Sequence, residues 1–363
     1  MDTYRSFVGL DVHARSIVGC ALDAVTGEVT HRSFGGGNAE VLAWLGSLSG
    51  PVFAVYEAGP TGFGLFRACQ ETGIACVVAA PSKLQRPVGE KVKTDKNDAL
   101  HLARLAQLGQ ITAVRVPSVG EEAARDLVRA HEDVRIVLMS ARHRVSKLLL
   151  RQGIVYDRSL TTWTQKHQRW LLEHHFQPRS LQIAYENNCE AVLEATARRA
   201  RLEKEMLAIA ADSDFTPIVN RLGVLRGMAP IPALGLAVEI GDWSRFTGST
   251  IGSFVGLVPA EYSTGGSRSQ GAITKVGNAH ARWILVEAAW QHKRYLASTP
   301  GRTLQTRRQA APLAVRARGD DGNRRLHRQW VKYVARNKKN TIAATAIARE
   351  LAGWCWSVAT MDA

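Results

Sequence analysis

The order of the predicted secondary-structure elements in the first 108 residues is the strongest constraint on the fold. Apolar and β-branched runs predict strands, and apolar residues that recur every three or four positions predict helices. The expected elements are strands at 6–12, 16–22 and 29–34, a helix at 38–48 with Asn38 as its N-cap, a strand at 51–57, a helix at 62–71, a strand at 74–79 and a helix at 94–108. A turn signal at 23–27 makes a hairpin of the second and third strands, so this region predicts an α/β domain with a mixed sheet.

Four carboxylates stand at the ends of these elements. Asp11 and Glu57 end two apolar runs that predict buried strands, and Asp95 and Asp98 lie three residues apart at the start of the last helix. The element order is that of a ribonuclease-H-like domain, in which the strands ending at Asp11 and Glu57 are neighbours. Residues three apart also share one face of a helix, so the four acids are expected to converge.

Converging acids of this kind indicate a magnesium site. Mg²⁺ prefers oxygen ligands, and two such ions about 4 Å apart stabilise the attacking and leaving oxygens of phosphoryl transfer. Without a cation, neighbouring carboxylates raise one another's pKa and cost stability. Singly, Asp11 could be a turn residue, Glu57 a solvated acid, and the two helix acids could serve the helix dipole. Their combination favours Asp11, Glu57, Asp95 and Asp98 as ligands of two Mg²⁺ ions.

The actin-like sugar kinases also have a first strand that ends in Gly-x-Asp. In those proteins a glycine-containing phosphate loop follows the aspartate. Residues 12–16 here contain no glycine, and the chain has no Gly-x-x-x-x-Gly-Lys-Ser/Thr loop. A kinase or an ATPase is therefore not expected.

Positive charge is concentrated in the second half of the chain. The net charge is +15, and residues 221–363 hold 21 Lys and Arg against 8 Asp and Glu, which accounts for +13 of it. A basic half beside a carboxylate-bearing half is typical of nucleic-acid enzymes, in which one part grips phosphates and the other performs metal chemistry. A basic surface without such a role is the alternative.

The five cysteines are scattered and form no Cys-x-x-Cys pair. This pattern indicates neither a zinc site nor a disulfide framework, and a reducing cytoplasm is the simplest compartment. The sequence has no basic-then-apolar signal segment and no run of about 18 apolar residues that would predict a membrane span. We therefore expect a cytoplasmic protein without a membrane partner.

The middle of the chain predicts long amphipathic helices. From residue 119 onward apolar residues step by three or four, and a second helix is expected at about 180–211. The predicted buried face of the first helix consists of Leu127, Ala130, Val134, Val137, Ala141, Val145 and Leu148. The pattern favours a coiled-coil spacer or dimer strut, and the expected domains are 1–118, 119–215 and 216–363.

A Gly- and Ser-rich loop at 262–271 is the main chemical feature of the third domain. Ser263 and Thr264 lie in it, and a hydroxyl nucleophile needs exposure, mobility and nearby positive charge. Arg268, Lys275 and Arg282 could supply that charge. A plain surface loop is the alternative for this segment taken alone.

The C-terminal end interleaves aromatic and basic residues. Such a pattern can stack on nucleobases while it neutralises phosphates, or it can be a helix with aromatic residues in the core and solvated cations. The residues are Trp330, Lys332, Tyr333, Arg336, Lys338 and Lys339. The preceding segment, 300–327, is expected to be loose and basic, and a last helix is expected at about 341–356.

The chain resembles the DEDD-type insertion-sequence transposases of the IS110 family over essentially its whole length. The motifs that carry the resemblance are Gly-Leu-Asp-Val-His at 9–13, Tyr-Glu-Ala-Gly-Pro-Thr-Gly at 56–62, Val-Lys-Thr-Asp-Lys-Asn-Asp-Ala at 92–99, Glu-Ile-Gly-Asp at 239–242, Gly-Leu-Val-Pro at 256–259, Tyr-Ser-Thr-Gly at 262–265 and Ile-Thr-Lys-Val-Gly-Asn at 273–278. Together these motifs are specific, although no single one would suffice.

The resemblance implies a RuvC-like N-terminal domain, a coiled-coil middle and a C-terminal transposase domain. It implies that the four acids hold Mg²⁺ and that a serine of the C-terminal domain forms a covalent link to DNA beside the acids of a partner subunit. It also implies a structured bridge RNA that pairs with donor and target DNA, and self-association as a dimer or tetramer. The family pattern Tyr-x-Ser-Gly puts Thr264 at the serine position and Ser263 one residue earlier.

The resulting hypothesis is an Mg²⁺-dependent, RNA-guided DNA recombinase, associated with the nucleoid when active, that moves its own element. A RuvC-like nuclease or junction resolvase without a covalent intermediate is the main alternative. A nucleic-acid-binding protein without catalytic activity is a third possibility.

Overall fold

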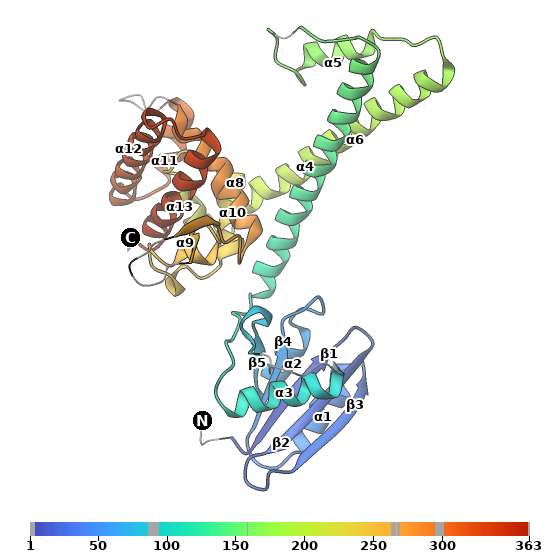
Figure 1. The fold of residues 1–363 in the computed structure, drawn as a ribbon, viewed down its shortest axis with the longest axis vertical. Coiled ribbons are helices and arrows are strands. Elements are labelled where there is room, and N and C mark those ends of the chain that lie inside the picture. Colours follow the sequence, from blue (N-terminus) through green and yellow to red (C-terminus); the bar gives the residue numbers. More distant parts are fainter. Residues whose placement is uncertain are drawn as a thin grey trace. The chain divides into compact units, whose positions relative to one another are not determined.

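The computed structural model describes residues 4–85, 94–157, 159–262, 266, 269–294 and 301–361. The chain divides into two compact units, Met1–Pro117 and Ser118–Ala363. The first is a mixed α/β domain and the second is mostly helical, as the sequence predicts (Figure 1). The division into three domains stays a prediction.

The first unit is built on a five-stranded mixed sheet with the order β3-β2-β1-β4-β5. Its strands are β1 (Ser6–Val12), β2 (Ser16–Asp23), β3 (Val29–Gly35), β4 (Val52–Glu57) and β5 (Ala75–Ala79). The first three strands form an antiparallel meander, whereas β4 is parallel to both β1 and β5. The central position of β1 therefore joins the antiparallel and parallel halves of the sheet.

Helices cover both faces of this sheet. On one face, α1 (Asn38–Ser47) and α2 (Gly64–Glu71) bury Val41 and Leu65 against β1 and β4. On the other face, α3 (Asp95–Gln107) buries Leu102 against Phe7 of β1 and Val55 of β4. A short 3₁₀ turn, Pro81–Lys83, follows β5. The predicted N-cap of α1 is wrong: Gly37 holds that position, and no side chain caps the helix.

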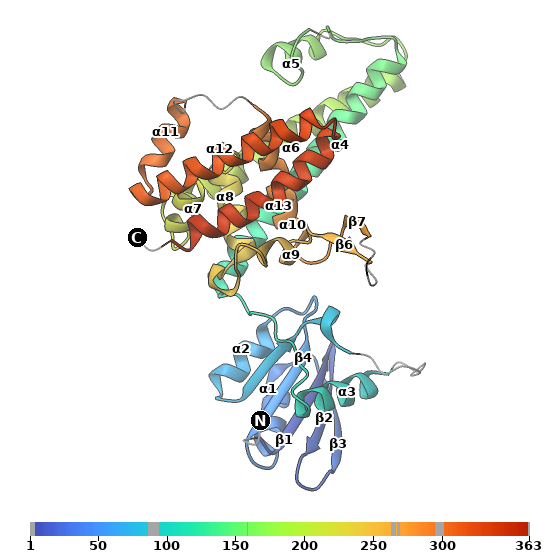
Figure 2. The same cartoon turned by 60° about the vertical axis from the view of Figure 1, so that its left-hand side comes forward.

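Two long antiparallel helices begin the second unit. The helices α4 (Val119–Arg151) and α6 (Arg179–Ala211) pack along each other, and α5 (Gln165–Leu172) lies near their far end (Figures 1 and 2). A capping box between Ser118 and Glu121 starts α4. Most of the predicted face of α4 is buried, but Ala130 and Val137 are exposed. Those two assignments were wrong because Val128, two residues before Ala130, and Leu138, one residue after Val137, take the buried positions.

A helical core surrounds α8 in the rest of the second unit. Most of α8 (Pro230–Ile240) is buried, and it packs against α7 (Thr216–Leu222) and α10 (Ala279–Ala289). The helix α13 (Asn340–Ala359) packs against α10 and α12 (Leu313–Ala335). The remaining elements are the helices α9 (Ile251–Phe254) and α11 (Arg302–Gln309), the 3₁₀ turns Trp243–Arg245 and Trp290–Lys293, and the strands β6 (Pro259–Glu261) and β7 (Gln270–Ile273).

The predicted loose segment at 300–327 is wrong, because α11 and most of α12 occupy it. Val315 and Leu326 of α12 belong to the main core. An ion pair between Arg308 and Asp320, at 2.5 Å, joins α11 to α12. None of the described helices is long and apolar enough to cross a bilayer.

Candidate active site

Asp11 and Glu57 lie at matching ends of two neighbouring parallel strands. Leu10 of β1 is in register with Tyr56 of β4, and the two acids are the next residues of their strands. Successive side chains of a strand alternate between the faces of a sheet. Phe7, four positions before Asp11, packs beneath α3, and so does Val55, two positions before Glu57. Both acids therefore belong to the face of the sheet that α3 covers.

The start of α3 carries the other two acids. Thr94 is the N-cap, and its hydroxyl accepts a hydrogen bond at 3.3 Å from the backbone N–H three residues on. Asp95 and Asp98 stand in the first turn, where the helix dipole favours negative charge. A Cβ on Gly9 would lie 1.9 Å from the carbonyl oxygen of Ala99, so only glycine lets α3 approach β1 this closely.

A pocket of about 650 Å³ opens at this edge of the sheet, and all four acids line it. His13 lines it as well. Its Nε2 lies 3.4 Å from Oδ2 of Asp11 and 3.9 Å from Oδ1 of Asp95. Ligand atoms of these three residues all lie within 4.8 Å of one another. The fold therefore gathers the predicted acids around one hollow and adds an imidazole to them.

The surroundings of Asp11 in the pocket affect the charge of its carboxyl. Burial raises the pKa of its carboxyl above the usual 3.8, the nearby His13 opposes this rise, and Asp95 and Asp98 add to it. An ionised Asp11 thus costs free energy that a bound cation would offset. Carboxylate oxygens with one imidazole nitrogen are a donor set that fits a divalent metal ion.

His13 was missed in the sequence prediction. It stands two residues after Asp11, and its backbone N–H still donates a hydrogen bond to the carbonyl of Ser16, at 2.9 Å, as the β1–β2 pairing ends. Side chains two apart in an extended segment point to the same side. That spacing is the sequence signal that places His13 on the same side as Asp11.

The predicted hydroxyl loop connects β6 and β7. Ser263, Thr264 and Arg268 lie outside the described residues. The flanks of the loop are described: Glu261 pairs with Gln270, and the backbone N–H of Tyr262 donates to the carbonyl of Ser269 at 2.9 Å. β6 and β7 therefore form an antiparallel hairpin, and Tyr262 is 79% exposed.

The predicted phosphate-binding cations differ in their surroundings. Lys275 is exposed, and its backbone takes a left-handed φ of 55°. The guanidinium of Arg282 instead donates to the carbonyls of Val255 and Val276, at 2.9 and 3.2 Å, and so holds the backbone near the hairpin. Arg268 lies outside the described residues, so its role in phosphate binding stays a prediction. The cations at the end of α12 and after it, Lys332, Arg336, Lys338 and Lys339, are exposed.

Trp330 belongs to the core and is not available to stack on a base. Its side chain is 1% exposed, and its ring centroid lies 5.6 Å from that of Trp290. Tyr333 is half-buried. Of the two interpretations of the aromatic and basic pattern, the structure supports the core role for Trp330.

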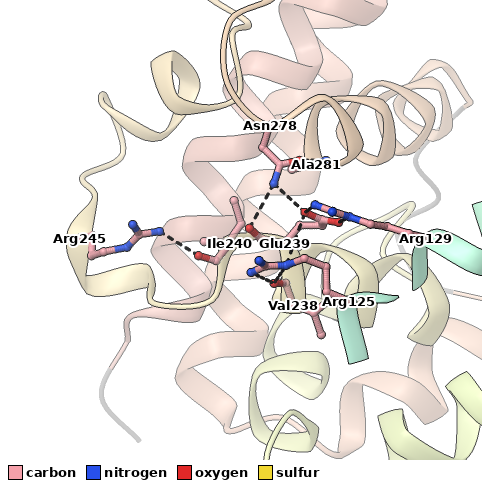
Figure 3. A network of polar contacts seen from close by, with 8 residues as sticks. All are labelled: Arg125, Arg129, Val238, Glu239, Ile240, Arg245, Asn278 and Ala281. Atoms are coloured by element: carbon pink, nitrogen blue, oxygen red, sulfur yellow. Dashed lines mark hydrogen bonds and ion pairs between the residues drawn. The ribbon is translucent and has the colours of Figure 1, made fainter. Parts of the chain in front are cut away.

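A buried polar network surrounds Glu239 of α8 (Figure 3). The side chain of Glu239 is fully buried, and its carboxylate accepts hydrogen bonds from Arg129 of α4 at 3.0 and 3.3 Å. Asn278 donates to the same carboxylate at 2.7 Å, while its side-chain oxygen caps α10 by accepting from the N–H of Ala281. Arg125 donates to the carbonyl of Val238 at 2.9 Å. The network joins α4, the end of α8 and the segment that follows β7.

Comparison with known proteins connects this architecture with DNA transposition. A family model of DEDD transposases of IS110 matches residues 8–152, and the model described as the transposase IS116/IS110/IS902 family matches residues 219–302. The protein y4qE of Sinorhizobium fredii, which is named as a transposase, is 35% identical over 370 residues, 99% of this chain and 89% of its own. The transposase for insertion sequence element IS1533 of Leptospira borgpetersenii is 28% identical over 342 residues, 92% of this chain and 98% of its own.

A mixed α/β sheet followed by a mostly helical unit is the architecture of a RuvC-like transposase. With its two family matches and its full-length relatives, the chain belongs to the IS110 family of DEDD transposases. It is thus an enzyme of the class that cleaves and recombines DNA, and enzymes of the DEDD type use divalent metal ions.

Proposed function

We propose that this transposase is an Mg²⁺-dependent, RNA-guided recombinase that excises and inserts its own mobile element through a covalent hydroxyl–DNA intermediate. The observation that carries the proposal is the single pocket that Asp11, Glu57, Asp95 and Asp98 line together. His13, beside two of these acids, adds a further donor to the pocket.

The four acids are the ligands of two Mg²⁺ ions in this proposal. Bound there, the ions neutralise the phosphate and stabilise the attacking and leaving oxygens of the reaction. Asp11 and Glu57 project from paired strands, so the sheet holds their positions. Asp95 and Asp98 follow the capped start of α3, so their positions depend on how closely this helix packs on β1.

The nucleophile is a hydroxyl of the loop between β6 and β7. Its oxygen forms a bond to the phosphorus of a DNA strand, one P–O bond of the strand breaks, and the departing oxygen takes up a proton as the hydroxyl proton passes to a base. Ser263 is favoured by its unbranched side chain, and Thr264 by the family register. The exposed Lys275 near the hairpin supports the binding of a phosphate there.

Self-association and a guide RNA complete the proposal. The acids of one subunit act with the hydroxyl of a partner in a dimer or tetramer, and a bridge RNA pairs with donor and target DNA. The paired helices α4 and α6 support a coiled-coil contact between subunits, since they expose several large apolar side chains. Among these are Ile136, Val137, Met139, Ile183, Leu193 and Leu207. Phosphates of the nucleic acids are bound by Arg268, Lys275, Arg282, Lys332, Arg336, Lys338 and Lys339.

Strand cleavage and covalent attachment are measured together on a denaturing gel with a matched DNA substrate and guide RNA. Asp11→Asn and Asp98→Asn are expected to abolish Mg²⁺-dependent cleavage while RNA binding persists. Asp23→Asn is the matched control, because Asp23 lies at the far end of β2, in register with Ser6. Full activity of the pocket variants would overturn the metal site.

The hydroxyl is identified on the same gel. A protein–DNA adduct that disappears in Ser263→Ala but persists in Thr264→Ala identifies Ser263, and the reverse pattern identifies Thr264. The alternative function, a RuvC-like nuclease without a covalent intermediate, is favoured by one observation: all four acids lie in a compact unit of their own. Mg²⁺-dependent cleavage without any adduct would support this alternative.

A further inference from the structure

A groove of the second unit lies against the β6–β7 hairpin. This groove has a volume of about 1090 Å³. The exposed side of α13 forms one wall with Thr345, Ala346 and Arg349, and β7 contributes residues 270–273. Arg318 and Tyr333 of α12 complete it. In the ribbon, the hairpin extends outward next to α9, which packs against α13 (Figure 2).

The charge of the groove is positive. Arg318 and Arg349 line it and are exposed, and its one acidic lining residue, Glu350, is paired with Arg325. One end of the groove is lined by Tyr333 and residues 341–342. These residues flank the connection between α12 and α13. That connection carries the exposed Arg336, Lys338 and Lys339. Cations therefore stand both along the groove and at this end, as binding of a polyanion requires.

The groove also offers flat surfaces. The guanidinium of Arg318 lies 4.3 Å from the ring centroid of Trp354 and donates to the hydroxyl of Ser357 at 2.8 Å, so its plane is fixed. Tyr333 is half-buried and its side of α12 lines the groove, where it adds an aromatic ring. Aromatic rings and fixed guanidinium planes stack with unpaired bases, whatever the sequence.

We infer that this groove binds an unpaired strand of DNA next to the point of cleavage. Cations for phosphates, planar groups for bases and the hydroxyls of Thr341 and Thr345 for polar edges share one concave surface. A single strand can place its bases in such a hollow, whereas a duplex keeps them stacked inside. The choice of DNA over RNA rests on the proposed function, because the hairpin that borders the groove carries the proposed nucleophile.

Binding of a fluorescein-labelled single-stranded DNA oligonucleotide, followed by anisotropy with EDTA present, tests the inference on the full chain. Arg349→Ala removes one exposed cation, and Ala346→Trp fills the groove. Each is expected to weaken binding about 10-fold. Arg349→Ala is also expected to reduce the slope of log K against log salt by about 0.7. Arg328→Ala, an exposed arginine of α12 that does not line the groove, is expected to change binding by less than about twofold.

Three results would overturn the inference. One is unchanged DNA binding in both groove variants. Another is a loss of affinity in Arg328→Ala equal to that in Arg349→Ala, which would show that binding depends on the net charge and not on the groove. The third is a stronger groove-dependent affinity for RNA or duplex DNA of the same sequence. Binding is measured in EDTA and adduct formation in Mg²⁺, so the two proposals can fail separately. Groove-dependent binding in EDTA with no covalent adduct in Mg²⁺ would disprove the proposed nucleophile alone, and an adduct in Mg²⁺ with unchanged binding by the groove variants would disprove the groove alone.

Discussion

Arg129 places two nitrogens of its guanidinium on the carboxylate of Glu239, at 3.0 and 3.3 Å. The two side chains differ in exposure, since Arg129 is 44% exposed and Glu239 is fully buried. Loss of the arginine therefore leaves a buried carboxylate short of partners, whereas loss of the carboxylate leaves a guanidinium that water can reach. We expect Arg129→Met to lower the free energy of unfolding by about 3 kcal/mol, and Glu239→Gln by less.

Urea unfolding followed by circular dichroism measures this asymmetry. Arg144→Met is the matched control on the same helix, because the bond of Arg144 to Asn188 is exposed. Its expected cost is below about 0.5 kcal/mol. An equal or larger effect of Glu239→Gln would show that the buried charge is not what Arg129 stabilises.

Gly9 is expected to tolerate no side chain. A methyl group there would meet both the carbonyl oxygen of Ala99, at 1.9 Å, and the backbone nitrogen of Ala103, at 2.7 Å. Because these are backbone atoms, α3 must move away, which displaces Asp95 and Asp98 from Asp11. Gly9→Ala should cost about 3 kcal/mol of stability and weaken Mn²⁺ binding measured by titration calorimetry. Gly35→Ala, where nothing lies within 4 Å, is the control, and equal behaviour of the two variants would contradict the close packing.

His13 is expected to tune the choice of metal. An imidazole nitrogen suits Mn²⁺ better than Mg²⁺, which prefers oxygen ligands. Replacement of His13 by Ala should therefore weaken Mn²⁺ binding about 10-fold and Mg²⁺ binding much less. Calorimetric titrations of both ions check this, with His31→Ala on β3, outside the pocket, as the control. An equal loss for both ions would mean that His13 acts only by positioning Asp11.

His292 is expected to make the second unit sensitive to acid. Burial lowers the pKa of its ring from 6.5 to about 3, and the charge of Arg226 acts in the same direction. Below pH 6.5 the unfolded chain binds a proton that the folded chain refuses, so stability falls as the pH is lowered from 6.5 towards 3. At pH 5 the loss is about 2 kcal/mol.

His292→Leu removes the group that titrates, so the variant should lose less stability than the parent between pH 7 and pH 5. The difference between the two slopes, measured by urea unfolding, separates His292 from the other acids and bases of the chain. Parallel slopes would mean that His292 is protonated in the folded chain.

Strong local patterns made the first unit predictable. The apolar runs that end in Asp11 and Glu57 became adjacent parallel strands, and the spacing of Asp95 and Asp98 put both acids in one helical turn. Their common pocket follows from this order, while their role as ligands stays a prediction. His13 could not be predicted as a pocket residue in the same way, because the direction of its side chain depends on how far the pairing of β1 extends.

The error at 300–327 has a physical cause. Glycines and clustered arginines predict a loop, and the sequence of α12 contains Gly319 and Gly322. A Cβ on Gly319 would lie 2.4 Å from a methyl group of Val224, so this glycine serves close packing between a helix and a neighbouring segment. Tertiary contacts of this kind override helix propensity, and they are not visible before the partner segment is known. For the same reason Trp330 could not be assigned to the core in advance.

The four acids and the hydroxyl loop belong to different compact units, so the proposed active site can be divided between chains. A chain with Asp11→Asn keeps its hydroxyl, and a chain with both Ser263→Ala and Thr264→Ala keeps its acids. Neither should recombine DNA alone. If the halves act between subunits, mixing the two defective proteins should restore activity by complementation, because mixed assemblies contain one intact combination. Two inactive preparations would then become a working enzyme in one tube.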